Sequence, residues 1–476
     1  MSRFREWFSP LVHLSNNWIS LIGVLFVTTS TVLWIYLLPT TFGGQLSNPY
    51  LGILGFLVLP GIFFTGLALI PLGIWLKLRR ERGRGTYPTD FPPLTLRNVE
   101  FRRLLVFVGV ATFANIIIGS QLTYGALHYM DSVTFCGQTC HTVMQPEFVA
   151  YQNSPHSRVE CVKCHIGPGA SWFVRSKLSG VGQVFAVAFD TYPRPIPTPV
   201  HNLRPARDTC EGCHWPQKYG ADRLRVISKF AEDEANTQTK TALLMKIGGH
   251  GSEGVGIHGF HMREGAVFEY AHADERRQEI PWVRYTTPEG KVVEYFAEGV
   301  KPADVRKLPV RLMDCMDCHT RPSHSFDLPE PAMNGAMTRG LISPHLPFAK
   351  KHSMEILQKT YATREQAMAE IPRQFEAVYR EQHPEIYQQR KAEVEAAGKA
   401  LFDLWGRNVF PAMNVTWGTY PNNIGHTDFP GCFRCHDGAH TSADGNRTIG
   451  QDCGSCHNLL AMDEPDPEVL STLGVQ

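Results

Sequence analysis

Cysteine and histidine are the residues of this chain whose types and spacing point most directly to chemistry. The 476-residue sequence has 12 cysteines, and all of them fall into six close pairs. In every pair, a histidine follows the second cysteine directly. The pairs are Cys136/Cys140, Cys161/Cys164, Cys210/Cys213, Cys315/Cys318, Cys432/Cys435 and Cys453/Cys456, and the histidines are His141, His165, His214, His319, His436 and His457.

Five of the pairs have two intervening residues and match the CxxCH pattern of c-type haem attachment. In that pattern two thioether bonds fix the haem to the backbone, and the adjacent histidine places an imidazole nitrogen on the iron. Paired cysteines also hold structural zinc or form disulfides. Those sites do not require a histidine after each second cysteine, so we expect five c-type haems.

The sixth pair lies in "FCGQTCHTVM", residues 135–144, and has three intervening residues. The flexible stretch Gly137-Gln138-Thr139 can absorb the extra residue as a bulge. A disulfide between Cys136 and Cys140 is the alternative. Because every other cysteine belongs to a haem motif, we interpret this pair as a sixth c-type haem site.

Histidines outside the motifs are candidates for the opposite, distal side of each iron. Histidine on both sides gives an electron-transfer haem, whereas an open side permits substrate chemistry. Each candidate could instead be an ordinary hydrogen-bonded histidine. We expect distal ligands among those near the motifs or in the close pair "GIHGFH": His156, His258, His261, His324, His426 and His440.

A membrane anchor is predicted for the first 130 residues, because they contain three apolar runs of spanning length. Basic residues precede the first run and fill the segment 77–103 between the second and third, which predicts that both face the cytoplasm. The remainder of the chain then lies in the periplasm, and we expect an inner-membrane protein. The runs contain no histidine, so they are an anchor in the lipid or a surface for other membrane subunits. They are residues 18–38, 50–76 and 104–127.

The expected fold class is mainly α with much irregular structure. Three N-terminal transmembrane helices are followed by a multihaem domain with a small β-hairpin, which two alternating runs around Pro288-Glu289-Gly290 predict. The net charge of +1 argues against a nucleic-acid partner. We expect an anchor at 1–130, haem motifs 1–3 at 131–220, a middle region at 221–330, a helical segment at 331–410 and a dihaem region at 411–476.

The helical segment carries two local signals. Thr363 with Gln366 predicts a capping box at the start of a helix, and a second helix is expected near Pro384. One face of the first helix is predicted to hold Met368, Ile371, Phe375 and Val378.

The run "FCGQTCHTVMQPEFVAYQNSPHSRVECVKCHIGPG", residues 135–169, continued by "RPARDTCEGCHWP", residues 204–216, resembles the NapC/NirT/NrfH family of membrane-anchored multihaem cytochromes. The resemblance implies that quinol is oxidised beside the first haem and that electrons pass to periplasmic partners. It also implies that Met144 is an axial ligand, with a packing methionine as the alternative. Three membrane runs and six haem motifs, against the family's usual one and four, make this chain an extended relative.

Oxidation of quinol releases protons, so titratable groups near the first motif are candidates for the quinol site. Asp131 and Glu147 flank that motif, and Lys177 in the amphipathic stretch "SWFVRSKLSGVGQV" is the third candidate. Each of them could also be an ordinary surface charge. The predicted function is a quinol dehydrogenase that feeds a haem chain toward periplasmic cytochromes or extracellular acceptors. An electron-relay subunit of a larger membrane complex and a terminal multihaem reductase are the alternatives.

Overall fold

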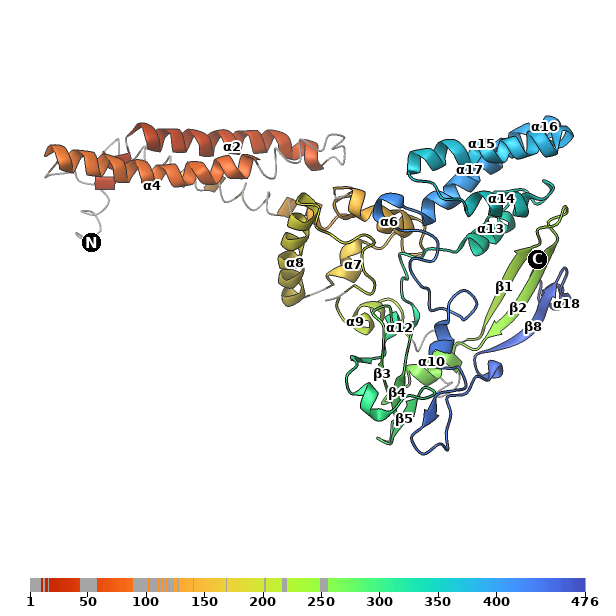
Figure 1. Cartoon of the computed structure of the whole chain (residues 1–476). Coiled ribbons are helices and arrows are strands. Elements are labelled where there is room, and N and C mark those ends of the chain that lie inside the picture. The colour runs from red at the N-terminus through yellow and green to blue at the C-terminus, as the bar shows by residue number, and fades with distance from the viewer. Residues whose placement is uncertain are drawn as a thin grey trace. The chain divides into compact units, whose positions relative to one another are not determined.

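The chain forms two compact units, residues 1–130 and residues 131–476, in a computed structural model (Figure 1). The structure describes residues 10–475, with gaps at 12, 16, 43–57, 89–101, many positions between 103 and 127, 140, 168, 201–202, 216–220 and 249–255. The predicted third membrane run, residues 104–127, therefore lies mostly outside the described residues.

In the first unit, helices α2 (Trp18–Phe42) and α4 (Leu59–Arg84) pack against each other. Glycine makes the close approach possible: a Cβ on Gly66 would lie 2.7 Å from the backbone oxygen of Gly23. The hydroxyl of Ser20 donates a hydrogen bond to the backbone oxygen of Ile70 at 3.0 Å. Small residues at such crossings are typical of helices packed within a bilayer.

Helix α4 is, among the described residues, the one helix long and apolar enough to cross a membrane. It continues to Arg84, so the basic residues predicted to form a loop after position 76 instead extend the helix by two turns. Gly85 then ends it in the left-handed region, with φ of 67°. At this polar end, Lys77 donates to the backbone oxygen of His13 at 2.6 Å.

In the second unit, the haem motifs lie on short helical turns joined by irregular chain. Longer helices surround the first three motifs. The elements of this part are a π-helical turn (Phe135–Thr139), α6 (His141–Gln152), α7 (Cys161–His165), α8 (Ala170–Ala188) and α9 (Ala206–Cys210).

Two antiparallel sheets make the second unit richer in strands than the predicted small hairpin. The hairpin itself is confirmed as β4 and β5, but it is the middle of a five-stranded sheet in the order β6-β3-β4-β5-β7. The other sheet has the order β1-β2-β8. The strands are β1 (Arg223–Phe230), β2 (Gln238–Met245), β3 (Val267–Ala271), β4 (Trp282–Thr286), β5 (Val292–Phe296), β6 (Val310–Leu312), β7 (Thr441–Ser442) and β8 (His457–Glu464).

Both sheets combine the middle of the chain with its C-terminal part. Strand β7 pairs with β5. Strand β8 pairs with β2, beside which it lies in Figure 1. Short helices connect these strands and carry motifs 4–6: α10 (Gly256–His261), α11 (Pro302–Val305), α12 (Cys315–Cys318), 3-10 turns at Pro411–Met413, Gly431–Arg434 and Cys453–Ser455, and α18 (Glu468–Thr472).

The predicted helical segment supplies most of the largest apolar core described in the second unit. Its long helices α15 and α17 lie side by side (Figure 1). Its helices are α13 (Pro329–Thr338), α14 (Ala349–Leu357), α15 (Arg364–Gln382), α16 (Pro384–Gln389) and α17 (Lys391–Asn408).

The start of α15 is close to the prediction, but the residues that the helix buries match the predicted face only in part. The Thr363 side chain accepts a hydrogen bond from the backbone nitrogen of Gln366 at 3.1 Å, while the Gln366 side chain bonds Ala362 instead of closing the capping box. Of the residues predicted to share one face, Ile371 and Phe375 are fully buried, whereas Met368 is 63% exposed. The buried stripe has a spacing of four residues: Ala367, Ile371, Phe375 and Tyr379.

Candidate haem-binding sites

The first motif forms the π-helical turn Phe135–Thr139. A π-helix places one more residue in each turn than an α-helix, so this geometry accommodates the third intervening residue. Gly137 is required there, because a Cβ on it would lie 2.0 Å from the Phe148 ring. Cys140 and the side chain of His141 lie outside the described residues.

In motifs 2–6, numbered in chain order, the histidine of each motif faces one histidine from elsewhere in the chain. None of the five partners comes from the same motif segment, and the ring planes are inclined to one another by 23° to 79°. The pairs, with ring-centre distances, are His165–His324 (6.2 Å), His214–His156 (5.9 Å), His319–His258 (6.2 Å), His436–His261 (5.9 Å) and His457–His426 (6.3 Å).

These distances fit two imidazoles on opposite sides of one metal. A metal–nitrogen bond is about 2 Å long, and the centre of an imidazole lies roughly 1 Å beyond its nitrogen, which gives about 6 Å between ring centres. Ligands on both sides of the iron leave no open position for a substrate. The residues therefore suit haem groups that transfer electrons.

Hydrogen bonds to Nδ1 orient several of these rings and leave Nε2 free for the iron. His324 Nδ1 donates to the backbone oxygen of Glu147 at 2.9 Å, and His261 Nδ1 to that of Ile257 at 2.8 Å. Burial lowers the pKa of the paired histidines His165, His258, His261, His319 and His324, which favours the neutral imidazole that binds metal.

His440 differs from the other five distal candidates. Its Nδ1 is 2.9 Å from the Asp437 carboxylate and its Nε2 is 2.7 Å from the backbone oxygen of Ile280. Because both ring nitrogens of this buried histidine face protein oxygens, His440 links the chain after motif 5 to the segment at Ile280. Met144 is half-buried on α6.

The motifs are neighbours in the order in which they occur along the chain. The Cys161 thiol is within hydrogen-bonding reach of Cys136, which joins motifs 1 and 2. The thiols of Cys210 and Cys315 join motifs 3 and 4 in the same way. The remaining neighbours lie near enough for their thiols to influence one another electrostatically: Cys164 and Cys213, Cys318 and Cys435, and Cys432 and Cys456.

Comparison with known proteins agrees with this arrangement. Residues 99–195 match the NapC/NirT cytochrome c family, N-terminal region. The chain is 40% identical over 450 residues to the cytochrome c-type protein ImcH of Geobacter sulfurreducens, a match that covers 93% of this chain and 88% of ImcH. The chain belongs to the NapC/NirT cytochrome c family. No solved structure matches it.

Membership of the NapC/NirT family implies covalent haem c and quinol-linked electron transfer, so the predicted quinol-site residues are of interest. Glu147 lies on α6, where its carboxylate accepts a hydrogen bond from Arg321 at 2.5 Å and lies 3.5 Å from Nδ1 of His324. It therefore contacts the histidine that faces His165 of motif 2. Asp131 is half-buried at the start of the second unit, and Lys177 is on α8 with its side chain outside the described residues.

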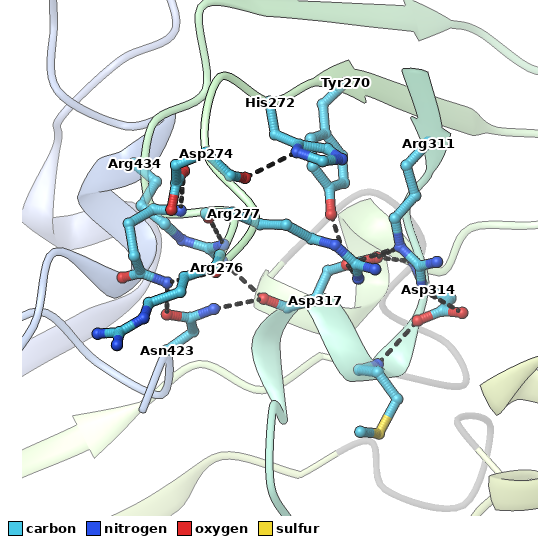
Figure 2. A network of polar contacts seen from close by, with 12 residues as sticks. Tyr270, His272, Asp274, Arg276, Arg277, Arg311, Asp314, Asp317, Asn423 and Arg434 are labelled. Atoms are coloured by element: carbon cyan, nitrogen blue, oxygen red, sulfur yellow. Dashed lines mark hydrogen bonds and ion pairs between the residues drawn. The ribbon is translucent and has the colours of Figure 1, made fainter. Parts of the chain in front are cut away.

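Motifs 4 and 5 of this NapC/NirT cytochrome share a buried polar network that the sequence did not reveal (Figure 2). Asp317, between the cysteines of motif 4, is 3% exposed and accepts hydrogen bonds from Tyr270 (2.6 Å), Arg311 (2.9 Å) and Arg277 (3.2 Å). Burial and the Asp317 carboxylate raise the pKa of Tyr270, so its hydroxyl remains a donor. Arg434, between the cysteines of motif 5, donates to the backbone oxygen of Asp317 at 2.6 Å.

Proposed function

We propose that this NapC/NirT cytochrome oxidises quinol at the periplasmic face of the inner membrane and passes the electrons through six c-type haems to periplasmic or extracellular acceptors. The observation that carries the proposal is the set of five facing histidine pairs in a series of neighbouring motifs. Haem c, when bound, supplies an iron that gains and loses one electron reversibly.

The residues have separate tasks in this proposal. Each cysteine pair would fix a haem to the chain, and each motif histidine would ligate its iron. His156, His258, His261, His324 and His426 would supply the second ligands. Glu147 and Arg321 hold His324 in place. Met144 is the proposed second ligand at motif 1, whose His141 side chain lies outside the described residues.

The apolar first unit supports a membrane location. We propose three spans, with the segment around Arg84 in the cytoplasm and the second unit in the periplasm, because basic residues favour the cytoplasmic side. Large apolar side chains such as Phe64 and Trp75 are exposed on α4, as lipid contact requires. The haem-binding unit begins at residue 131, next to the last predicted run.

Motif 1 is the proposed entry point, because it follows the anchor within ten residues, where a lipid-soluble quinol can reach it. Asp131 and Lys177 remain proposed titratable groups of the quinol site, with the Asp131 carboxylate as the proton acceptor. Motif 6 is the proposed exit, because it is the far end of the series and its Cys453 is exposed. Periplasmic electron-accepting cytochromes are the proposed partners there.

The direct test is reduction of the purified protein by a menaquinol analogue in detergent, without any other subunit, followed in the haem absorption bands. We expect rapid reduction of most of the haem that dithionite reduces. A protein that dithionite reduces fully but quinol does not would favour the relay-subunit alternative, in which a partner oxidises the quinol. High-spin haem with turnover of a small oxyanion would favour a terminal reductase.

A further inference from the structure

The helical segment contains another pair of facing histidines that belongs to no haem motif. His352 is on α14, and His383 lies between α15 and α16. Their ring centres are 5.7 Å apart, with the planes inclined by 56°. His352 is 5% exposed and therefore lies inside the apolar core of this segment.

The pair has ring nitrogens that no protein group satisfies. Both nitrogens of His352 and Nε2 of His383 are buried and have no hydrogen-bond partner. Buried polar atoms nearly always have a partner, because losing hydration without replacement is costly. By contrast, the equally buried His440 has an oxygen close to each nitrogen. These unpaired nitrogens of His352 and His383 are therefore available to bind a ligand such as a metal ion.

A single metal ion fits the distances. Two imidazoles that bind one ion through bonds of about 2 Å at a tetrahedral or wider angle have ring centres roughly 5 to 6 Å apart. The Glu355 carboxylate, one turn along α14, lies 3.7 Å from Nδ1 of His352. Two ligand atoms on one tetrahedral ion are about 3.4 Å apart, so a small rotation of the Glu355 side chain completes a third ligand.

Haem does not fit the same place. The rings of Tyr379 and Phe348 lie 5.5 Å and 6.0 Å from that of His383, and Tyr379 is fully buried. These rings occupy the space beside the imidazoles that a porphyrin would need. No described group of three or more histidine, cysteine or acidic side chains is already gathered around one point. A three-ligand site here therefore requires the rotation of Glu355.

We propose that His352, His383 and Glu355 bind one divalent transition-metal ion of the Zn²⁺ class, which ties α14 to the junction of α15 and α16. Two imidazoles and a carboxylate are a donor set that such ions prefer. The ion has a structural role, separate from the haem series. Phe348, which starts α14 in the left-handed region with φ of 55°, sets the direction in which that helix presents His352.

The test uses the haem-loaded protein after treatment with a chelator, dialysed against micromolar Zn²⁺ and analysed for zinc and iron together. We expect one zinc for every six iron atoms in the wild type. The variants His352→Asn and His383→Asn are expected to bind zinc at least about tenfold more weakly. His345→Asn, a change to an exposed histidine in the same segment, is expected to bind like the wild type.

The iron content and the helical circular dichroism of each variant show whether it has folded, so loss of zinc can be separated from loss of structure. A wild type that retains no zinc would overturn the proposal and indicate a pair bridged by water. Equal zinc content in wild type and in folded His352→Asn and His383→Asn would also overturn it, because the metal would then lie elsewhere.

Discussion

At the scale of single residues, the hydrogen bonds of each imidazole separate the candidate haem ligands from the structural histidines. His324 and His261 use Nδ1 for a backbone oxygen and keep Nε2 for the metal, whereas both nitrogens of His440 face protein oxygens. The sequence could not make this distinction, because His426 and His440 are both close to motif 5. A hint was present in Asp437, three residues before His440, where it can reach the ring.

Replacing His426 and His440 separately tests this distinction. His426→Ala removes the ring that faces His457, so we expect one of six haems to become high-spin. His440→Ala should leave all haem spin states unchanged and lower only the stability, because it breaks buried hydrogen bonds. Electron paramagnetic resonance counts the high-spin haems. A high-spin signal in His440→Ala but not in His426→Ala would reverse the assignment.

At the scale of elements, buried contacts between motifs hold the series together. The Asp317 network joins α12 to strands β3 and β6 through Tyr270 and Arg311, and to the motif 5 turn through Arg434 (Figure 2). Removing one partner of a buried ion pair leaves the others without compensation. The network is therefore expected to contribute more to stability than an exposed ion pair would.

Asp317→Asn tests the network. The change keeps the size of the side chain but removes the charge that balances Arg277 and Arg311, so we expect the free energy of unfolding to fall by about 3 kcal/mol. Thermal melting followed by circular dichroism measures the effect. The control is Glu298→Gln, the same loss of charge at an exposed position, which should change stability by less than about 0.5 kcal/mol. Equal melting temperatures of Asp317→Asn and Glu298→Gln would contradict the prediction.

Much of the local structure was predictable, and the long-range pairing was not. The β4–β5 hairpin and the helices around Thr363 and Pro384 follow from turn and capping signals. Strands β1, β2 and β8 have only one buried residue each and carry many polar residues, so they lack a clear alternating pattern. Likewise, His156 precedes motif 2 closely in sequence but faces the histidine of motif 3. Which strands pair and which histidines face each other depends on tertiary packing, which local sequence signals do not encode.

At the scale of the whole molecule, the second unit does not divide at its C-terminal motifs. Residues after Tyr420 supply β7 and β8, one strand to each sheet, and motif 5 contacts motif 4. A truncation would therefore disrupt the middle of the unit together with the proposed exit. Substitution of single cysteine pairs is the better way to remove one haem at either end.

The most direct test of the proposed series compares two five-haem proteins. Cys136→Ser/Cys140→Ser removes the proposed entry site, and Cys453→Ser/Cys456→Ser removes the proposed exit. Reduction by a menaquinol analogue is followed by stopped-flow absorption, with dithionite as the control for total reducible haem. We predict that the entry variant is reduced by dithionite but not by quinol, while the exit variant is reduced by quinol at the wild-type rate. Wild-type quinol reduction in the entry variant would contradict the account.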